Sequence, residues 1–400
     1  MYKFLRHGRG SRSSRRFLDV KKMKRNVFFL WLLLALAVGL IITGYVFDLR
    51  SEPDAQPYVS NTPPHIDVSI GDKEVFLVGA VVEEWTKNET NAVELYNHYR
   101  TFGKVYTAKS AVIKWGVFDI PEGSFITSQY FELATMENFQ DVEKYELRPA
   151  DRSIELPRLL VDCQYYYRVT LGLDSGQQCV AEGSFKTAWS PRIIEFENLR
   201  NIRDIGGWKT QDGKVIRQEM LYRGCELDGA TEENCVAPQS VVDTMVKELK
   251  IRSELDLRSA DTNGVRDILG SDVKHQYFAL PSYAGSFTDE SNQALKGIFS
   301  ALAMEENYPV YLHCTKGTDR TGIVCYLLEA LLGVPEEDCY REWELSVLDS
   351  GQDNHDAMDQ FIENLRKCEG NTLQEKTENY LRLIGVTQEE INSIRSLLVA

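Results

Sequence analysis

The sequence predicts three kinds of structure in succession: one transmembrane helix, an all-β sandwich, and an α/β domain with a central, largely parallel sheet. Residues 27–47 contain no charge, residues 66–190 contain several short strand-like runs, and residues 191–400 alternate strand-like runs with helical ones. A chain of 400 residues is long enough for two or three such domains.

The uncharged segment VFFLWLLLALAVGLIITGYVF, residues 27–47, is long enough to span the hydrocarbon core of a bilayer as a helix. Residues 1–26, which precede it, carry ten Lys and Arg against one acid, Asp19. The positive-inside rule then places this basic tail in the cytoplasm and everything after about residue 50 outside it. A cleaved signal peptide is the alternative, but the apolar run continues well past the weak Ala-x-Ala site at Ala35 and Ala37.

The charge of the chain is unevenly distributed. The formal net charge is −15 at pH 7, and because the basic tail contributes +9, the rest of the chain carries −24. Phosphate backbones are bound by basic surfaces, so a body this acidic disfavours nucleic acid as the main partner. The bilayer, contacted through residues 27–47, is the partner that the sequence predicts first.

Residues 66–190 are predicted to form a β-sandwich after an extended linker, residues 48–65, that is rich in Pro and small polar residues. The runs YYYRVTLGL and CVAEGSFKT flank the hairpin turn signal Asp-Ser-Gly at 174–176. Helical periodicity is scarce here, apart from residues 91–99. The last two strands resemble the end of a fibronectin type III domain, which implies a spacer or binding module whose partner is unknown.

The eight cysteines do not form the dense pattern of a disulfide scaffold. Cys163 and Cys179 could pair across the predicted hairpin outside the cell. No Cys-x-x-Cys pair is present, so the sequence gives little support for a structural zinc site, and we predict neither a metal nor a cofactor.

Residues 191–400 combine strands and helices. The strand-like runs are 251–257 and 308–313, and the helical ones are 241–249, 323–332, 374–383 and 387–398. Gly385 ends one of the last two helices, and Thr387 with Glu390 three residues later predicts a capping box at the start of the other. This alternation indicates an α/β domain with a largely parallel sheet.

The segment HCTKGTDRTG, from His313 to Gly322, lies between a predicted strand and a predicted helix. The backbone N–H groups of such a turn, with the helix N-terminus, can surround an anion. The same positive potential favours the thiolate form of Cys314, and Arg320 can bind two phosphate oxygens in a fork. The P-loop of nucleotide enzymes is excluded, because it needs Lys where Ile323 stands. The arrangement therefore predicts a site that holds a phosphate ester above a cysteine nucleophile.

This loop resembles the signature loop of cysteine-based protein tyrosine phosphatases, and its Asp-Arg-Thr-Gly ending is typical of a bacterial branch of tyrosine and dual-specificity phosphatases. Residues 201–224 (NIRDIGGWKTQDGKVIRQEMLYRG), 251–259 and 380–398 resemble three further segments of that branch in the same order. The resemblance covers about residues 195–400. It implies a phosphoric monoester hydrolase that acts on phosphotyrosine, with phosphoserine and phosphothreonine as further candidates, and that needs no metal.

The resemblance gives the residues of the loop separate roles. Cys314 would be the nucleophile, Arg320 would bind the phosphoryl group, and Thr321 would donate a hydrogen bond to the sulfur as it leaves. The amides that complete the phosphate cradle would belong to Thr315, Lys316, Gly317, Thr318 and Asp319.

The general acid that protonates the leaving oxygen is open between three aspartates. Asp319, beside Arg320 in the loop, is the candidate that the resemblance implies, and its other interpretation is an orienting contact to Arg320 or nearby backbone. Asp256, at the end of a predicted strand, is the second candidate, and Asp289, on a predicted loop, is the third. No Trp-Pro-Asp motif is present to decide between them.

Four charged residues in the matching segments are expected to form structural salt bridges rather than to contact substrate. They are Arg203, Asp204, Arg223 and Arg258.

Two other functions stay open for the same loop. A phosphoinositide or inositol phosphate phosphatase would need a deep basic pocket; the acidic body disfavours it, and Thr318 stands where the branch commonly has Lys, although Lys316 also offers a charge. A non-catalytic module would bind a phosphorylated ligand without turnover, but the intact Cys314 and Arg320 disfavour it. The prediction is a single-pass membrane phosphatase with its catalytic domain, residues 191–400, outside the cytoplasm, acting on a phosphorylated protein or a phosphoinositide.

Overall fold

The computed structural model describes residues 62–71, 74–88, 91–259, 267–283 and 286–400. The chain divides into two units, Met1–Pro63 and Pro64–Ala400, and nearly all described residues belong to the second. The predicted basic tail, the predicted transmembrane helix at 27–47 and most of the predicted linker lie outside the described residues. Within the described part of the chain, no helix is long and apolar enough to cross a membrane.

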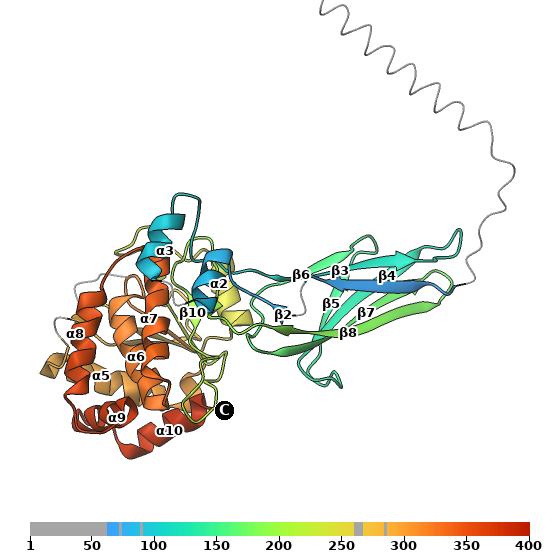
Figure 1. Cartoon of the computed structure of the whole chain (residues 1–400). Helices are drawn as coiled ribbons and strands as arrows, with labels where there is room; N and C mark the ends of the chain where they lie inside the picture. The colour runs from blue at the N-terminus through green and yellow to red at the C-terminus, as the bar shows by residue number, and fades with distance from the viewer. Residues whose placement is uncertain (1–61, 72–73, 89–90, 260–266, 284–285) are drawn as a thin grey trace, which may run out of the picture. The chain divides into compact units, whose positions relative to one another are not determined.

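Two β-sheets share one apolar core in the first part of the second unit (Figure 1). Trp115, Phe131 and Tyr167 stack in this core, with ring centroids 6.1 to 6.3 Å apart. The smaller sheet has the order β1 (His65–Ile70), β3 (Ala111–Phe118), β6 (Ser153–Leu156), and the larger one has the order β2 (Glu74–Val75), β8 (Gln178–Thr187), β7 (Gln164–Leu173), β4 (Ile126–Ala134), β5 (Glu143–Leu147). The resemblance to a fibronectin type III domain stays a prediction.

Two helices interrupt the segment that was predicted to be all-β. They are α2 (Ala80–Lys87) and α3 (Ala92–Tyr99), and the side chain of Asn91 caps α3 by accepting the N–H groups of Val93 and Glu94. The prediction is wrong over residues 80–87 because the apolar face of α2 does not pack in the sandwich. Its buried Val82 and Trp85 belong instead to the core of the α/β part.

The pairing of Cys163 with Cys179, which the sequence left open, does not occur in the structure. Cys179 lies opposite Leu171 on β7, whereas the carbonyl of Cys163 accepts a hydrogen bond from the N–H of Thr187 at the other end of the hairpin. At about 3.4 Å per residue, the eight positions from 179 to 187 separate the two cysteines by roughly 27 Å. A disulfide needs Cα atoms within about 7 Å, and both thiols are free.

The central sheet of the α/β part is mixed. Its strands have the order β13 (Lys274–Tyr277), β12 (Ser253–Asp256), β14 (Val310–His313), β11 (Leu221–Gly224), β10 (Arg203–Asp204), β9 (Arg192–Ile193). The first four are mutually parallel, and the last two join them in antiparallel pairs. The structure thus confirms parallel pairing for the strands that surround β14, and the antiparallel edge is the part that the sequence did not predict.

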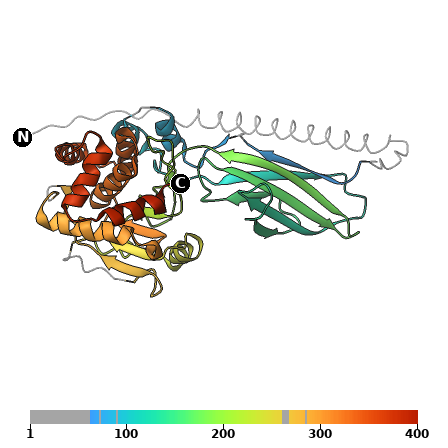
Figure 2. The same ribbon diagram turned by 90° about the horizontal axis from the view of Figure 1, so that it is seen from below.

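The helices of the α/β part are divided between two apolar cores: α6, which is buried along nearly its whole length, lies in one, whereas the buried Val241, Val242 and Met245 lie in the other (Figures 1 and 2). They are α4 (Gln239–Asp243), which continues into a single π-helical turn (Thr244–Glu248), α5 (Asp289–Leu302), a short 3-10 helix (Glu305–Asn307), α6 (Asp319–Leu332), α7 (Glu336–Ser350), α8 (His355–Arg366), α9 (Leu373–Leu383) and α10 (Gln388–Leu398). The capping box of Thr387 and Glu390 is confirmed, with Glu390 N to Thr387 Oγ1 at 3.2 Å.

Candidate active site

The loop from Cys314 to Thr318 lies at the carboxyl edge of the parallel strands. His313, the last residue of β14, is paired with Gly224 at the end of β11 and with Asp256 at the end of β12. Helix α6 begins directly after the loop, so its first N–H groups have no acceptor within the helix. The predicted strand, loop and helix are therefore present, in the position where open α/β sheets bind ligands.

Three consecutive carbonyls of this loop are held from outside. The bonds are Glu226 N to Thr315 O at 3.0 Å, Asn201 Nδ2 to Lys316 O at 3.1 Å, and Arg223 Nη2 to Gly317 O at 2.6 Å. In a planar trans peptide the C=O of one residue and the N–H of the next point in opposite directions. The N–H groups of Lys316, Gly317 and Thr318 therefore point away from these partners and toward the inside of the loop, which is the arrangement of an anion cradle.

Gly317 is required by the close approach of the loop to β11. Its φ is +70°, in the left-handed region, and a Cβ built on it would lie 2.3 Å from the carbonyl oxygen of Gly224. Only glycine fits such a position without moving the loop.

A buried ion-pair network holds the loop's outer partners in place. Arg223 Nη1 and Arg203 Nε each lie 2.6 Å from a different oxygen of Glu342 on α7, and Ser346 lies within hydrogen-bond distance of both guanidinium groups. All three charged side chains are at most 1% exposed. Burial opposes ionisation of Glu342, yet the two guanidinium groups hold its pKa below the usual value. The expected structural role of Arg203 and Arg223 is confirmed, whereas no motif in the sequence pointed to Glu342.

The other two residues expected to be structural also form buried ion pairs. Asp204 lies 2.7 Å from Arg192 and accepts the N–H groups of Gly206 and Glu219. Arg258 lies within 3.0 Å of three carboxylates, which belong to Glu226, Asp228 and Asp256.

Cys314 is 3% exposed and sits at the base of the loop. The Nδ1 atom of buried His313 lies 3.1 Å from the carbonyl oxygen of Cys314, and its Nε2 atom lies 2.8 Å from Glu254. A carbonyl can only accept, so Nδ1 carries a proton. Burial opposes a charge on this ring, but the hydrogen bond and charge of Glu254 raise the pKa of His313 to about 9. A positive imidazolium next to the nucleophile position adds to the potential that favours an anion there.

Arg320 lies across the loop, in the first turn of α6. Its Nη2 atom is 3.3 Å from Thr315 Oγ1, and its Nη1 atom is 3.5 Å from the carbonyl oxygen of Leu257. Both contacts are long and involve neutral oxygens, so they leave the guanidinium charge able to bind a phosphoryl group.

Two hydroxyls of the loop are buried without a hydrogen-bond partner among the described residues. They belong to Thr318 and Thr321, which are 2% and 0% exposed. A buried donor without a partner costs about 1–3 kcal/mol. A thiolate or phosphate oxygen would supply the acceptor, which fits the role expected of Thr321.

Lys316 forms an ion pair with Glu232 at the rim of the loop. Its Nζ atom lies 3.1 Å from Glu232, and both side chains are partly exposed. This carboxylate offsets part of the charge that Lys316 could offer to a highly phosphorylated ligand.

The structure separates the three candidates for the general acid. Asp319 opens α6 beside Arg320, and burial raises its pKa, although the hydrogen bond from Asn354 and the charges of Arg320 and Lys316 oppose this. Asp256 makes a two-pronged ion pair with Arg258; burial opposes its ionisation, but the nearby His275 and the hydrogen bonds from Arg258 hold its pKa well below the usual range. Asp289 is exposed in the first turn of α5. Of the three, Asp319 is the one that directly follows the loop, and its pKa is shifted toward the protonated form.

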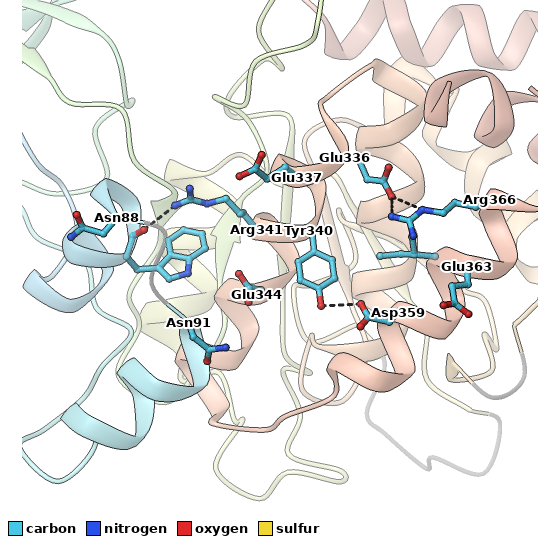
Figure 3. A pocket seen from close by; sticks show the side chains of 12 residues that line it. Asn88, Asn91, Glu336, Glu337, Tyr340, Arg341, Glu344, Asp359, Glu363 and Arg366 are labelled. Carbon is cyan, nitrogen blue, oxygen red and sulfur yellow. Dashed lines mark hydrogen bonds and ion pairs between the residues drawn. The ribbon is translucent and has the colours of Figure 1, made fainter. Parts of the chain in front are cut away.

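A cavity of about 780 Å³ lies apart from the loop, between helices α2 and α3 and helices α7 and α8 (Figure 3). Its lining includes five carboxylates against two arginines, and both arginines are engaged: Arg366 pairs with Glu336, while Arg341 donates to the carbonyl of Trp85 at 2.8 Å. None of the loop residues lines it. A cavity with this charge does not suit a phosphate ester.

A comparison with known proteins identifies the family of this chain. Residues 194–400 match the model of the tyrosine phosphatase family. Because the match covers just over half of the chain, the chain belongs to the tyrosine phosphatase family. The prediction of an enzyme of the phosphatase class is thereby confirmed at the level of the family.

The individual relatives that match share fewer than a third of the aligned residues with this chain. A tyrosine-protein phosphatase of Nostoc commune is 29% identical over 121 residues, which are 25% of this chain and 41% of that protein. A putative tyrosine-protein phosphatase of Cupriavidus necator is 25% identical over 185 residues, covering 41% of this chain and 67% of that protein. The match to the Nostoc protein thus spans less than half of its length.

Two solved structures of the catalytic core of Siw14 also match. The S. cerevisiae PP-IP phosphatase Siw14 in complex with citrate gives 15% identity and a TM-score of 0.26, covering 43% of this chain and 96% of that chain. The other Siw14 core gives 17% identity and a TM-score of 0.31, covering 47% and 96%.

Proposed function

We propose that this chain hydrolyses phosphotyrosine monoesters through a cysteinyl-phosphate intermediate on Cys314. The observation that carries the proposal is the loop itself: three carbonyls are held outward, so that three N–H groups face inward between Cys314 and Arg320. Phosphoryl transfer depends on positioning and on stabilising the charge of the equatorial oxygens, and this loop supplies donors for both.

The reaction has two steps. In the first, the thiolate of Cys314 attacks phosphorus, the S–P bond forms while the P–O bond to tyrosine breaks, and Asp319 gives its proton to the leaving oxygen. In the second, water attacks phosphorus, Asp319 takes a proton from that water, and the S–P bond breaks. The hydroxyl of Thr321 donates to the departing sulfur, and Arg320 holds the phosphoryl oxygens in both steps.

A substrate panel tests the proposed function. With the full chain, we expect kcat/KM for phosphotyrosine peptides to exceed the value for phosphoinositides, because Glu232 offsets the charge of Lys316 at the rim; phosphoserine and phosphothreonine peptides are included as further candidate substrates. Higher kcat/KM for phosphoinositides would overturn the choice of substrate in favour of a lipid or inositol phosphate phosphatase. Binding of phosphopeptides without release of phosphate would instead indicate a non-catalytic module.

The identity of the general acid is tested by leaving-group dependence. We expect Asp319→Asn to lower kcat/KM, which reports the first step, by about 10²- to 10⁴-fold for aryl phosphates with poor leaving groups and far less for good ones. Asp256→Asn, which weakens the ion pair with Arg258, should change kcat/KM by a similar factor for all substrates. If Asp256→Asn shows the stronger leaving-group dependence, the assignment of Asp319 is wrong.

We also propose that residues 27–47 anchor the chain in a bilayer, with residues 1–26 in the cytoplasm and the folded part outside. The support is the uncharged run and the basic block before it. Protease treatment of intact cells should digest residues 51–400, and protection of that region would contradict this topology.

A further inference from the structure

The side chain of Asn354 does not cap the helix that it precedes. Asn354 is the N-cap residue of α8, where an asparagine oxygen commonly accepts an N–H of the first helical turn. Here the side chain makes no such bond. Its Nδ2 atom instead donates to Oδ1 of Asp319, 35 positions earlier in the chain, at 2.8 Å.

The turn that carries Asn354 is fixed on both sides. Gly351 ends α7 in the left-handed conformation, with φ +66°. His355 then ties the turn to α7, since its Nδ1 atom lies 2.6 Å from Asp353 and its Nε2 atom lies 3.1 Å from Glu344. The side-chain amide of Asn354 therefore reaches Asp319 from a turn that is held by its own contacts to α7.

The chemistry of the contact distinguishes the two oxygens of Asp319. An amide NH₂ group can only donate, so Oδ1 acts as an acceptor. The proton of the neutral acid then resides on Oδ2. We propose that Asn354 is a positioning residue that fixes the carboxyl of Asp319 so that Oδ2 delivers the proton to the leaving oxygen. This inference rests on the proposed function, in which Asp319 is the general acid.

Other groups around Asp319 do not replace this contact. Lys316 and Arg320 belong to its own loop and act on it through their charge. The phenol of Tyr283, from the segment before α5, lies within electrostatic reach of Asp319; burial raises the pKa of that phenol far above its usual value, so it stays neutral. Tyr283 is itself held by Nε1 of Trp343 at 2.7 Å. Among the described residues, Asn354 is thus the neutral donor whose hydrogen bond reaches the carboxyl of Asp319.

The contact also has a defined effect on pH dependence. Burial raises the pKa of Asp319, and the bond from Asn354 lowers it. A general acid must be protonated, so the rate falls as pH rises through this pKa. Removing the bond raises the pKa further, and the fall should then move to higher pH.

Asn354→Ser tests the proposal with little risk to the fold, because serine is a good N-cap residue but is too short to hold the contact with Asp319. In the full chain, we expect kcat/KM for poor aryl leaving groups to fall by about 10- to 100-fold, with little change for good leaving groups. In an Asp319→Asn background the same substitution should cause no further loss, since Asn354 acts through Asp319. Asn354→Leu provides a second variant without a donor, and Gln352→Leu, at an exposed position in the same turn, is the control that should leave kcat unchanged.

The results separate this inference from the proposed function. Suppose that the loss of kcat/KM in Asp319→Asn depends on the leaving group. The role of Asn354 alone is then refuted if Asn354→Ser lowers kcat/KM by the same factor for all substrates, or if its loss adds in full to that of Asp319→Asn in the double variant. An unchanged kcat/KM in both Asn354 variants refutes that role as well. If Asp319→Asn itself is insensitive to the leaving group, both the acid assignment and this inference fall together.

Discussion

Cys314→Ser is expected to lower the turnover of an aryl phosphate by at least about 10⁴-fold while the chain remains folded. A serine hydroxyl is a far weaker nucleophile than a cysteine sulfur, and it stays protonated because the pKa of an aliphatic hydroxyl lies far above neutral pH. The change removes no large apolar group, so the free energy of unfolding should change little. Steady-state kinetics and a denaturant unfolding curve measure the two quantities on the same sample.

The matched control is Cys368→Ser. Cys368 is a half-buried free thiol just after α8, outside the catalytic loop. We expect its substitution to leave turnover unchanged. Turnover that survives in Cys314→Ser, or that is lost equally in both variants, would contradict a nucleophilic role specific to Cys314.

Glu342→Gln is expected to destabilise the fold by about 3–5 kcal/mol, because it leaves two buried guanidinium groups without their shared carboxylate. The change should also lower activity beyond the loss of folded protein. Arg223, one of the two arginines, holds the carbonyl of Gly317 and thereby the direction of the N–H group that follows it. Unfolding measured beside kcat per folded molecule separates the two effects.

Glu329→Gln offers an unusually close control for this prediction. Glu329 lies on α6 and is also fully buried, but no arginine pairs with it among the described residues. Burial and the nearby charge of Glu342 raise its pKa well above the usual value, so it is already a neutral acid. Replacing one neutral group by another should cost less than about 1 kcal/mol. Equal losses in the two variants would contradict the ion-pair account of the loop.

The catalytic loop could be predicted from the sequence because its parts are contiguous. The strand ending at His313, the cysteine after it and the helix that begins at Asp319 follow one another within a few residues, and each has a local signature. The capping box of the last helix, which involves Thr387, could be predicted for the same reason.

The partners that hold this loop could not be predicted, because they come from distant parts of the chain. Glu342 meets Arg223 across 119 positions, and Asn354 meets Asp319 across 35. Neither residue stands in a motif of its own. A charged residue on the buried face of a helix, as Glu342 is on α7, was the available signal.

The wrong prediction over α2 also arises because the packing partners of this segment lie far away in the sequence. Val82 and Trp85 are apolar residues that sit among predicted strands, and their local pattern does not reveal that they pack in the core of another part of the chain. The cysteine pairing that the sequence left open is excluded for a different reason. Its hairpin is real, but the register places Cys163 and Cys179 at opposite ends of it. A turn signal predicts that two strands pair and does not by itself bring two given side chains together.

The central claim is that phosphate passes through the sulfur of Cys314. Rapid acid quenching of the full chain during turnover of a phosphotyrosine peptide, followed by mass spectrometry of its proteolytic fragments, tests this most directly. The account predicts phosphate attached to the fragment that contains Cys314, in larger amount in Asp319→Asn if loss of the base slows hydrolysis of the intermediate. Turnover without phosphate on that fragment, or phosphate on another residue instead, would contradict it.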